Sequence, residues 1–486
     1  MVTIQSKRLG KREKPMRRYY PQALAITAAL ILAGCASVGP DYQQPKMELP
    51  AAWAAAPQDG KAAKGQRWWT VYDDAALDRL MDEAFKQNTD LMLAMARVDE
   101  ARALVGLARA DQFPDAGIRA GRSRTRSSQL TSMPLPSNVD PLSSSNRITL
   151  DVAYELDLWG KYRRATEAAR ADLLASEAAR DGVRLALSAD VARTYFTLSA
   201  LDAQTVITKR TIEIRRESLD LQRKRFTAGV SSELDLRQTE AELAAAEALL
   251  PSLERQRAQQ QNALAVLLGR SPKAIVEGNV DRTPMNVEAR YAPVVPEGLP
   301  SDLLLRRPDL REGEERLIAA NARIGVARAA YFPTISLTGF FGSESTSLAD
   351  LFSGPARTWQ FAAGLTQPLF AAGRIRAQAD AATAREQEAL AQYQKAVQSA
   401  FRDVQDALVS QSTARNQLDA EQRRTEALTQ SLKLARLRYD NGIANLLEVL
   451  DTERNLLSAE LNRAEALRVQ RVAVADLVKA LGGAWE

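Results

Sequence analysis

The chain has 486 residues, with 65 Lys and Arg against 60 Asp and Glu, no His and a single Cys. The absence of His removes the commonest acid-base side chain and metal ligand, and one Cys excludes an internal disulfide and a Cys-rich metal site. The sequence also contains no Gly-rich phosphate loop and no nucleophile motif. We therefore expect a protein that is not an enzyme and needs no cofactor or metal.

Residues 1–34 have the pattern of a secretory signal peptide. Seven Lys and Arg and one acid, Glu13, precede an apolar run at residues 23–33, which is too short to span a bilayer. The run ends in Leu-Ala-Gly-Cys (LAGC), which resembles a bacterial lipobox, so we predict that Cys35 becomes the lipidated first residue. The alternative is a buried free Cys after an ordinary signal. Ala36 follows the Cys, and by resemblance this favours sorting to the outer membrane.

The basic character of the chain belongs to this signal. Without residues 1–34, Lys and Arg fall from 65 to 58, and Asp and Glu fall from 60 to 59. The sequence pI of about 9.2 therefore gives no support for nucleic-acid binding.

The segment 35–72 is predicted to be a lipidated tether, because residues 36–66 are rich in Ala, Pro, Gly and Lys. Trp68 and Trp69 then fit either packing on a neighbouring element or a membrane interface, and we expect packing. Residues 74–110 read as helix, with a break near Asn88 and Thr89.

The periodicity changes to that of a strand after Pro114. Residues 147–158 alternate strictly between apolar and polar side chains, which predicts a strand with one apolar and one polar face. Residues 115–126 are its weaker partner. The predicted strands of this hairpin lie at about 115–126 and 145–158.

Two very long helices are predicted, each followed by a returning helix. The first occupies 161–228, ends at Gly229 and returns over 231–268. The second runs from Gly373 to Asn441, without Pro and without another Gly, and about 67 residues at roughly 1.5 Å each make a rod about 100 Å long. Its apolar positions step by three and four, which predicts a seam for another helix. The seam residues are Leu390, Tyr393, Val397, Ala400, Val404, Ala407, Leu428, Leu432, Ala435 and Tyr439.

The pattern occurs twice in the chain. The sequence GLARA at 106–110 recurs as GVARA at 325–329, and each precedes Phe-Pro. The hairpin exit and the helix turn recur 213 residues later. We predict a tandem duplication with a first repeat at 73–272 and a second at 301–486, whose strands lie at about 334–343 and 357–369. An irregular connection at 273–300 joins the repeats.

Four strands with one apolar and one polar face cannot close a barrel, and an open edge in lipid leaves backbone groups unsatisfied. Strands of this length suit a membrane span, and small outer-membrane barrels have at least eight strands. The predicted fold is therefore mainly α with a membrane β-barrel portion. Three protomers of long coiled helices plus four strands would trimerise into a 12-stranded β-barrel continuous with an α-helical barrel.

Several stretches together resemble the outer-membrane factor (TolC-type) family, in its lipoprotein branch from tripartite RND efflux systems (NodT/OprM-like). The resemblance covers nearly the whole mature chain. The stretches are 302–310 (DLLLRRPDL), 319–322 (AANA), 324–327 (IGVA), 330–335 (AYFPTI), 367–370 (QPLF), 373–375 (GRI), and Phe401, Val404, Asp406 and Ala407.

The resemblance implies a trimeric outer-membrane exit channel of a tripartite efflux pump. Such a channel passively conducts small molecules such as drugs from a periplasmic adaptor (membrane fusion protein) and an inner-membrane RND transporter. Two alternatives remain: a channel for an ATP-driven type I exporter, and a non-pore structural coiled-coil lipoprotein. The alternating strand pairs argue against the second alternative, because a coiled-coil lipoprotein or adaptor without a pore needs no lipid-facing strands.

The resemblance also implies a periplasmic gate where the helix pairs turn. Glu448 and Asp451 resemble acidic constriction residues, Leu447 an apolar plug, and Tyr439 a residue that latches neighbouring coils. Three copies of the two acids around an axis would repel other anions and attract cations. The alternative for both acids is a solvated helix face.

Other residues near the turns and at a helix start have competing explanations. Gly229 and Gly442 terminate helices and shape the tips. Glu233 and Asp235 either belong to an adaptor-docking surface or are solvated. Arg306 and Arg307 either bind an acidic ligand or form a structural ion pair with Asp302 or Asp309 at the helix start, and we expect the ion pair.

Overall fold

A computed structural model describes residues 37–47, 67–136, 138–285 and 307–483. Cys35 and the predicted signal lie outside the described residues. The chain divides into two compact units. Unit 1 comprises the described residues within 1–43, 104–170 and 318–387, and unit 2 those within 44–103, 171–317 and 388–486.

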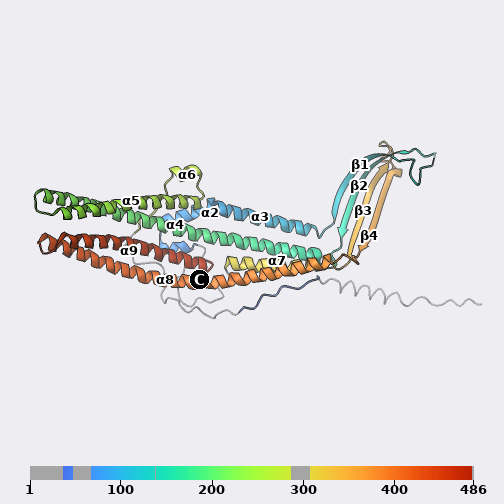
Figure 1. The fold of residues 1–486 in the computed structure, drawn as a ribbon. Coiled ribbons are helices and arrows are strands. Elements are labelled where there is room, and N and C mark those ends of the chain that lie inside the picture. Colours follow the sequence, from blue (N-terminus) through green and yellow to red (C-terminus); the bar gives the residue numbers. More distant parts are fainter. Residues whose placement is uncertain (1–36, 48–66, 137, 286–306, 484–486) are drawn as a thin grey trace, which may run out of the picture. The chain divides into compact units, whose positions relative to one another are not determined.

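Unit 1 contains one four-stranded antiparallel sheet (Figure 1). Its strands are β1 (Asp115–Arg126), β2 (Leu142–Glu155), β3 (Thr334–Ser345) and β4 (Arg357–Thr366), in the order β1-β2-β3-β4. Strand β2 begins and ends three residues before the predicted 145–158. Within the described chain, β1 and β4 have a partner on one side only, so both edges of the sheet are open.

The strand register gathers apolar side chains on one face of the sheet. Ile118 pairs with Leu150, Leu150 with Phe341, and Phe341 with Trp359. These four side chains form one row across all the strands, because residues paired in register point to the same side. Ile118 is 77% exposed and Trp359 is 73% exposed, so this apolar face is uncovered in the single chain.

The opposite face of the sheet is polar and carries ion pairs. Arg119 on β1 lies 3.4 Å from Asp151 on β2, and Arg147 on β2 lies 3.6 Å from Glu344 on β3. The hydroxyl of Ser145 donates to Glu344 at 2.9 Å. The two faces predicted from the alternation therefore differ in chemistry over the rows that contain these residues.

The helices repeat with equal lengths. Helices α3 (Thr89–Ala110) and α7 (Pro308–Ala329) have 22 residues each, α4 (Lys161–Thr227) and α8 (Arg374–Asp440) have 67 each, and α5 (Glu233–Leu267) and α9 (Leu446–Ala480) have 35 each. The bounds of α4 and α5 recur in α8 and α9 shifted by 213 residues. This regularity agrees with a duplicated chain.

The interior of unit 2 combines small and large apolar side chains. One core cluster joins Ala200 on α4, Leu418 on α8, Ala466 and Leu467 on α9, and Met285 from the connection. The predicted seam of α8 is confirmed in this unit. Its buried members are Tyr393, Val397, Ala400, Val404, Ala407 and Ala435.

The tryptophan pair lies in a short 3-10 helix of unit 2, η1 (Trp68–Tyr72). Both indoles are 2% exposed, and Trp68 Nε1 donates to Ser188 Oγ at 2.9 Å. The expectation of packing is therefore confirmed. Helix α2 (Ala75–Gln87) follows, capped by Asp74, and the predicted break falls at Asn88.

The connection between the repeats is not wholly irregular, and this corrects the prediction for 273–300. Helix α6 (Pro272–Glu277) forms there because Ser271 caps its start and Pro272 occupies the first turn, where a missing N–H costs nothing. Beyond the connection, at the start of α7, Arg307 pairs with Asp309 at 2.7 Å, as predicted. Arg306 and Asp302 lie outside the described residues. A three-residue 3-10 turn, η3 (Gly354–Ala356), precedes β4.

Within the ranges given above, the helices include none that is both long enough and apolar enough to cross a membrane.

Candidate functional site at the helix turns

Two tight turns in unit 2 connect α4 to α5 and α8 to α9. Gly229 has φ 75° and Gly442 has φ 70°, a left-handed conformation that Gly adopts without steric cost. After each Gly, the next amide bonds back to the carbonyl five residues earlier, at 2.8 and 2.9 Å. This is the Schellman arrangement, which satisfies the last carbonyls of a helix. Both predicted tip glycines therefore end a long helix.

The returning helices start differently at equivalent positions. Ser232 caps α5 in a capping box, in which the carboxylate of Asp235 accepts from the Ser232 amide and hydroxyl at 3.3 and 2.8 Å. Glu233 pairs with Arg237 at 3.3 Å. Both acids of the first turn thus have partners within their own helix. Whether they also belong to an adaptor-docking surface stays a prediction.

The second turn leaves its acid free of the cap. Asn445 accepts the Glu448 amide at 3.1 Å, so the cap is complete without the Glu448 carboxylate. That carboxylate lies 3.5 Å from Arg438 at the end of α8. Leu447, beside it, is 53% exposed. The turn therefore presents an acid and an apolar side chain together. The gate itself stays a prediction.

Tyr439 connects the two helix pairs. Its phenol oxygen accepts one hydrogen bond from Gln222 Nε2 and one from Arg225 Nη1, each at 2.9 Å. The Arg225 guanidinium also lies 5.4 Å from the centre of the ring. Because Gln222 and Arg225 are on α4 and Tyr439 is on α8, this contact holds the end of α4 to the end of α8.

Asp451 belongs to a chain of charges that spans three helices. Arg454 forms an ion pair with Asp451, and Asn455 Nδ2 donates to the same carboxylate at 3.1 Å. Arg454 also lies 3.4 Å from Glu242 on α5. Glu242 in turn pairs at 3.1 Å with Arg215 on α4, whose side chain is 4% exposed. The acid predicted at the constriction is thus linked to α5 and α4 through Arg454.

The sequence identified Leu447, Glu448, Asp451 and Tyr439 but missed the groups that hold them. Arg454 follows Asp451 by three residues, the spacing of neighbours on a helix, and this signal was available. Gln222 and Arg225 lie more than 210 residues from Tyr439 and gave no local signal.

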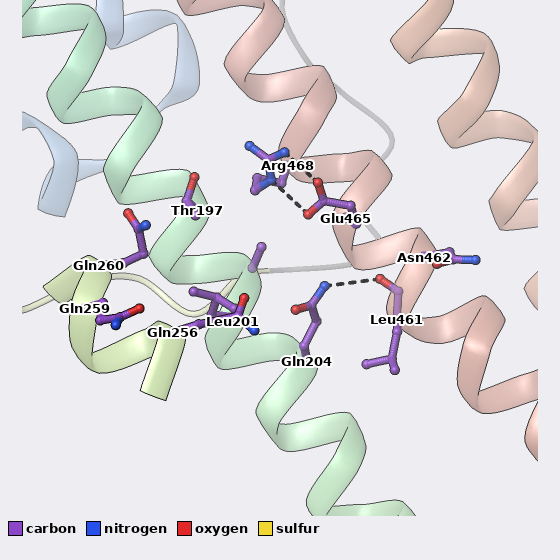
Figure 2. A pocket seen from close by; sticks show the side chains of 11 residues that line it. Thr197, Leu201, Gln204, Gln256, Gln259, Gln260, Leu461, Asn462, Glu465 and Arg468 are labelled. Atoms are coloured by element: carbon purple, nitrogen blue, oxygen red, sulfur yellow. Dashed lines mark hydrogen bonds and ion pairs between the residues drawn. The ribbon is translucent and has the colours of Figure 1, made fainter. Parts of the chain in front are cut away.

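A polar pocket of about 550 Å³ lies elsewhere in unit 2, between α4, α5 and α9 (Figure 2). Amide side chains dominate its lining, Gln204 Nε2 donates to the Leu461 carbonyl at 3.4 Å, and Glu465 pairs with Arg468. It contains none of the predicted site residues. Across the described parts of the chain, the carboxylates form no cluster suited to a metal ion.

Comparison with known proteins decides the family. The model of the family described as "Outer membrane efflux protein" matches residues 80–270 and 299–483. The chain belongs to this family. The recognition made from the sequence is confirmed, and the protein is an outer-membrane component of efflux.

Individual relatives of this outer membrane efflux protein match over nearly their whole length. The solvent efflux pump outer membrane protein SrpC of Pseudomonas putida is 38% identical over 96% of this chain and 98% of the relative. The probable outer membrane lipoprotein SilC of Salmonella typhimurium is 33% identical over 95% and 98%. The crystal structure of the Campylobacter jejuni CmeC outer membrane channel superposes with a TM-score of 0.88, at 27% identity, over 93% of this chain and 96% of that one.

Proposed function

We propose that three copies of this outer membrane efflux protein assemble into the exit channel of a tripartite efflux pump. The observation that carries the proposal is the open sheet in unit 1, whose edge strands β1 and β4 each lack a second neighbour in the described chain. In a bilayer the backbone N–H and C=O groups along these two edges have no water to bond, so the edges must pair with other chains. Joining β4 of one copy to β1 of the next satisfies every edge in a closed ring.

The ring has twelve strands if three copies join, since each supplies four. Its apolar face, with Ile118 and Trp359, faces lipid, and its ion-paired polar face lines water. Helices of 67 residues, about 100 Å long, continue the channel as an α-helical barrel. The duct is passive, and its partners supply the energy.

The helix turns form the closed end of the duct in this proposal. Glu448 and Asp451 from three copies constrict it and favour cations, and Leu447 adds an apolar plug. Tyr439 acts as the latch, because its contacts to α4 hold the two helix pairs together. The tips at Gly229 and Gly442 are then the ends that meet the adaptor.

The partners follow from the same assignment. SrpC is named as part of a solvent efflux pump, and an outer-membrane channel in such a pump needs a periplasmic adaptor and an inner-membrane transporter. We assign an RND transporter to this chain and small molecules, such as drugs, as cargo. SilC is named as a lipoprotein, and this supports a lipid on Cys35. The mass of the mature N-terminal peptide tests the lipid, which the variant Cys35→Ser would lack.

Disulfide crosslinking tests the ring. Ser123 on β1 is changed to Cys and combined in turn with Cys at Thr358, Gln360 or Ala362 on β4, which share its polar face. Pairing requires Cα atoms about 4.4–6.8 Å apart, so one combination should give a crosslinked trimer on a denaturing gel. The Ser123→Cys single variant is the control. Absence of a trimer ladder from every combination would overturn the ring.

Crosslinking in cells, followed by purification and mass spectrometry, tests the partners. Recovery of an adaptor and a proton-driven transporter supports the pump assigned here. Recovery of an ATP-driven exporter would instead support the type I alternative, in which the cargo is a peptide or protein. A chain recovered only with structural lipoproteins, and never as a trimer, would favour the non-pore alternative.

A further inference from the structure

One end of the apolar face of the sheet is basic. Along β1 this face carries Ala116, Ile118 and Ala120 and then three arginines. The pairing of β1 with β2 proceeds one residue at a time from Asp115 to Arg126, so no extra residue reverses the alternation. Strand β4 adds a fourth arginine, which pairs with Ser343 in the same row as Ala120. We call these residues the arginine rim: Arg122, Arg124, Arg126 and Arg357.

The rim differs from the other arginines of the sheet in having no partner. Arg119 and Arg147 lie on the polar face and pair with Asp151 and Glu344. All four rim side chains are exposed, and within the described residues none of them makes an ion pair or a side-chain hydrogen bond. Asp140, in the nearby hairpin loop, accepts the Leu142 amide at 2.9 Å. Four unneutralised positive charges therefore lie on the face that the proposed function turns toward lipid.

The rim lies where the apolar band of the sheet ends. It is on the side of the hairpin loops 127–141 and 346–356, whereas the other ends of the strands join helices. On β2 the apolar positions from Tyr154 to Ile148 rise about 20 Å, close to the ~25 Å apolar band of a membrane strand. Trp359, two residues beyond Arg357, is 73% exposed, and exposed aromatic rings mark the boundary between lipid tails and headgroups. Long arginine stems extend from there into the headgroup layer.

We propose that the arginine rim binds phosphate groups of membrane lipids in the leaflet on the loop side of the sheet. This rests on the proposed barrel, which turns the rim outward. Arginine suits such a ligand, because its planar guanidinium donates two parallel hydrogen bonds to phosphate oxygens. Three copies place twelve guanidinium groups around the barrel. Ser343, in the same row as Arg357, adds a hydroxyl beside them.

Lipid binding by the full-length trimer tests the rim. Native mass spectrometry counts lipids retained from phosphatidylcholine vesicles that contain bisphosphorylated lipid A, or the same lipid with its phosphates removed. We compare wild type with the variant Arg122→Gln, Arg124→Gln, Arg126→Gln and Arg357→Gln. The matched control removes four exposed helical arginines that also have no side-chain partner: Arg97→Gln, Arg255→Gln, Arg385→Gln and Arg415→Gln.

Wild type and the control are expected to prefer the phosphorylated lipid by about tenfold, and the rim variant should lose that preference. The inference is overturned if wild type shows no preference or if the rim variant keeps it. It is also overturned if millimolar inorganic phosphate displaces the lipid completely, because the site would then take free phosphate and not a headgroup.

Conductance in pure phosphatidylcholine bilayers separates this inference from the proposed function. A trimer that conducts there but shows no preference among lipids contradicts only the rim. A chain that neither forms trimers nor conducts contradicts the proposed channel itself.

Discussion

Tyr439 on α8 accepts a hydrogen bond from the side-chain amide of Gln222 on α4 at 2.9 Å, across 217 residues of sequence. Gln222 is 2% exposed, so water does not replace this partner. The contact ties together two helix pairs that belong to different repeats. A channel that opens at its helix turns must separate such contacts. Tyr439 is therefore the first residue to substitute.

Tyr439→Phe removes the oxygen that accepts from Gln222 and Arg225. A buried donor left without a partner costs about 1–3 kcal/mol, so we expect a lower apparent melting temperature and a higher conductance of the closed channel. Circular dichroism melting and planar-bilayer recording measure the two effects. Tyr331→Phe, in unit 1, is the control. If Tyr439→Phe conducts and melts like wild type, Tyr439 is not a latch.

Arg454→Ala breaks the charge chain that links Asp451 to Glu242 and Arg215. We expect it to raise conductance, because α9 loses its ionic link to α5. Arg237→Ala is a matched control at the neighbouring tip, since Arg237 pairs only within α5, with Glu233 and Glu240. Equal conductance of the two variants would mean that Arg454 is only an exposed surface residue and that its link to α5 does not limit conductance.

Asp202 on α4 should contribute to the stability of the fold at neutral pH, and this contribution should be lost at acid pH. Burial acts to raise the pKa of Asp202, but hydrogen bonds and charge from Arg282 and Arg257 outweigh it and lower the pKa below its usual value. A lowered native pKa stabilises the fold above the unfolded pKa of about 3.9, and this contribution is lost as pH falls below that value. Asp202→Asn should therefore destabilise the protein at pH 7 by about 1–3 kcal/mol, with a smaller difference from wild type near pH 3.

Guanidinium unfolding at several pH values measures this difference. Asp419→Asn is the control, because Asp419 pairs with Arg423 on an exposed helix face, and such pairs contribute little. A constant difference between wild type and Asp202→Asn from pH 7 to pH 3 would contradict the assignment.

Gly442→Ala and Gly482→Ala should differ in thermal stability, although both glycines follow the end of a helix and have positive φ. At Gly442 an added Cβ meets no atom of the described chain within 4 Å, so the cost is that of the left-handed backbone, about 1–2 kcal/mol. At Gly482 the Cβ would lie 2.7 Å from Arg307 Cγ and 2.9 Å from its Cα, which adds a clash. Thermal melting should therefore rank Gly482→Ala as the less stable variant. The reverse order would contradict the described packing at Gly482.

Periodicity predicted the helices and strands well because it is a local property. Alternation over 147–158 and the three-four spacing along α8 each follow from the geometry of one element. The second pair of strands could be predicted because the pattern of the first repeat recurs in the second. Helix α6 was missed because six residues with a Ser cap and a leading Pro leave too short a pattern inside a Pro-rich connection.

Contacts between elements could not be predicted in the same way. Whether Gln222 meets Tyr439 depends on how α4 and α8 are rotated about their axes, and a rotation of one residue, about 100°, would turn Gln222 away. The pairing of Arg454 with Glu242 depends on the same rotation between α9 and α5. The arginine rim required the strand register, because only the paired rows show that Arg357 on β4 shares a face with Arg122, Arg124 and Arg126 on β1.

The most direct test of the channel and its gate is single-channel conductance of the purified full-length protein in planar bilayers. Wild type is compared with the double variant Glu448→Ala and Asp451→Ala, and with Glu217→Ala and Asp220→Ala on α4 as the control. We predict that wild type forms trimers with small, cation-selective conductance steps. The double variant should conduct more and lose selectivity, because the acidic constriction is gone. A protein that stays monomeric and never conducts would contradict the channel, and unchanged conductance in the double variant would contradict the gate.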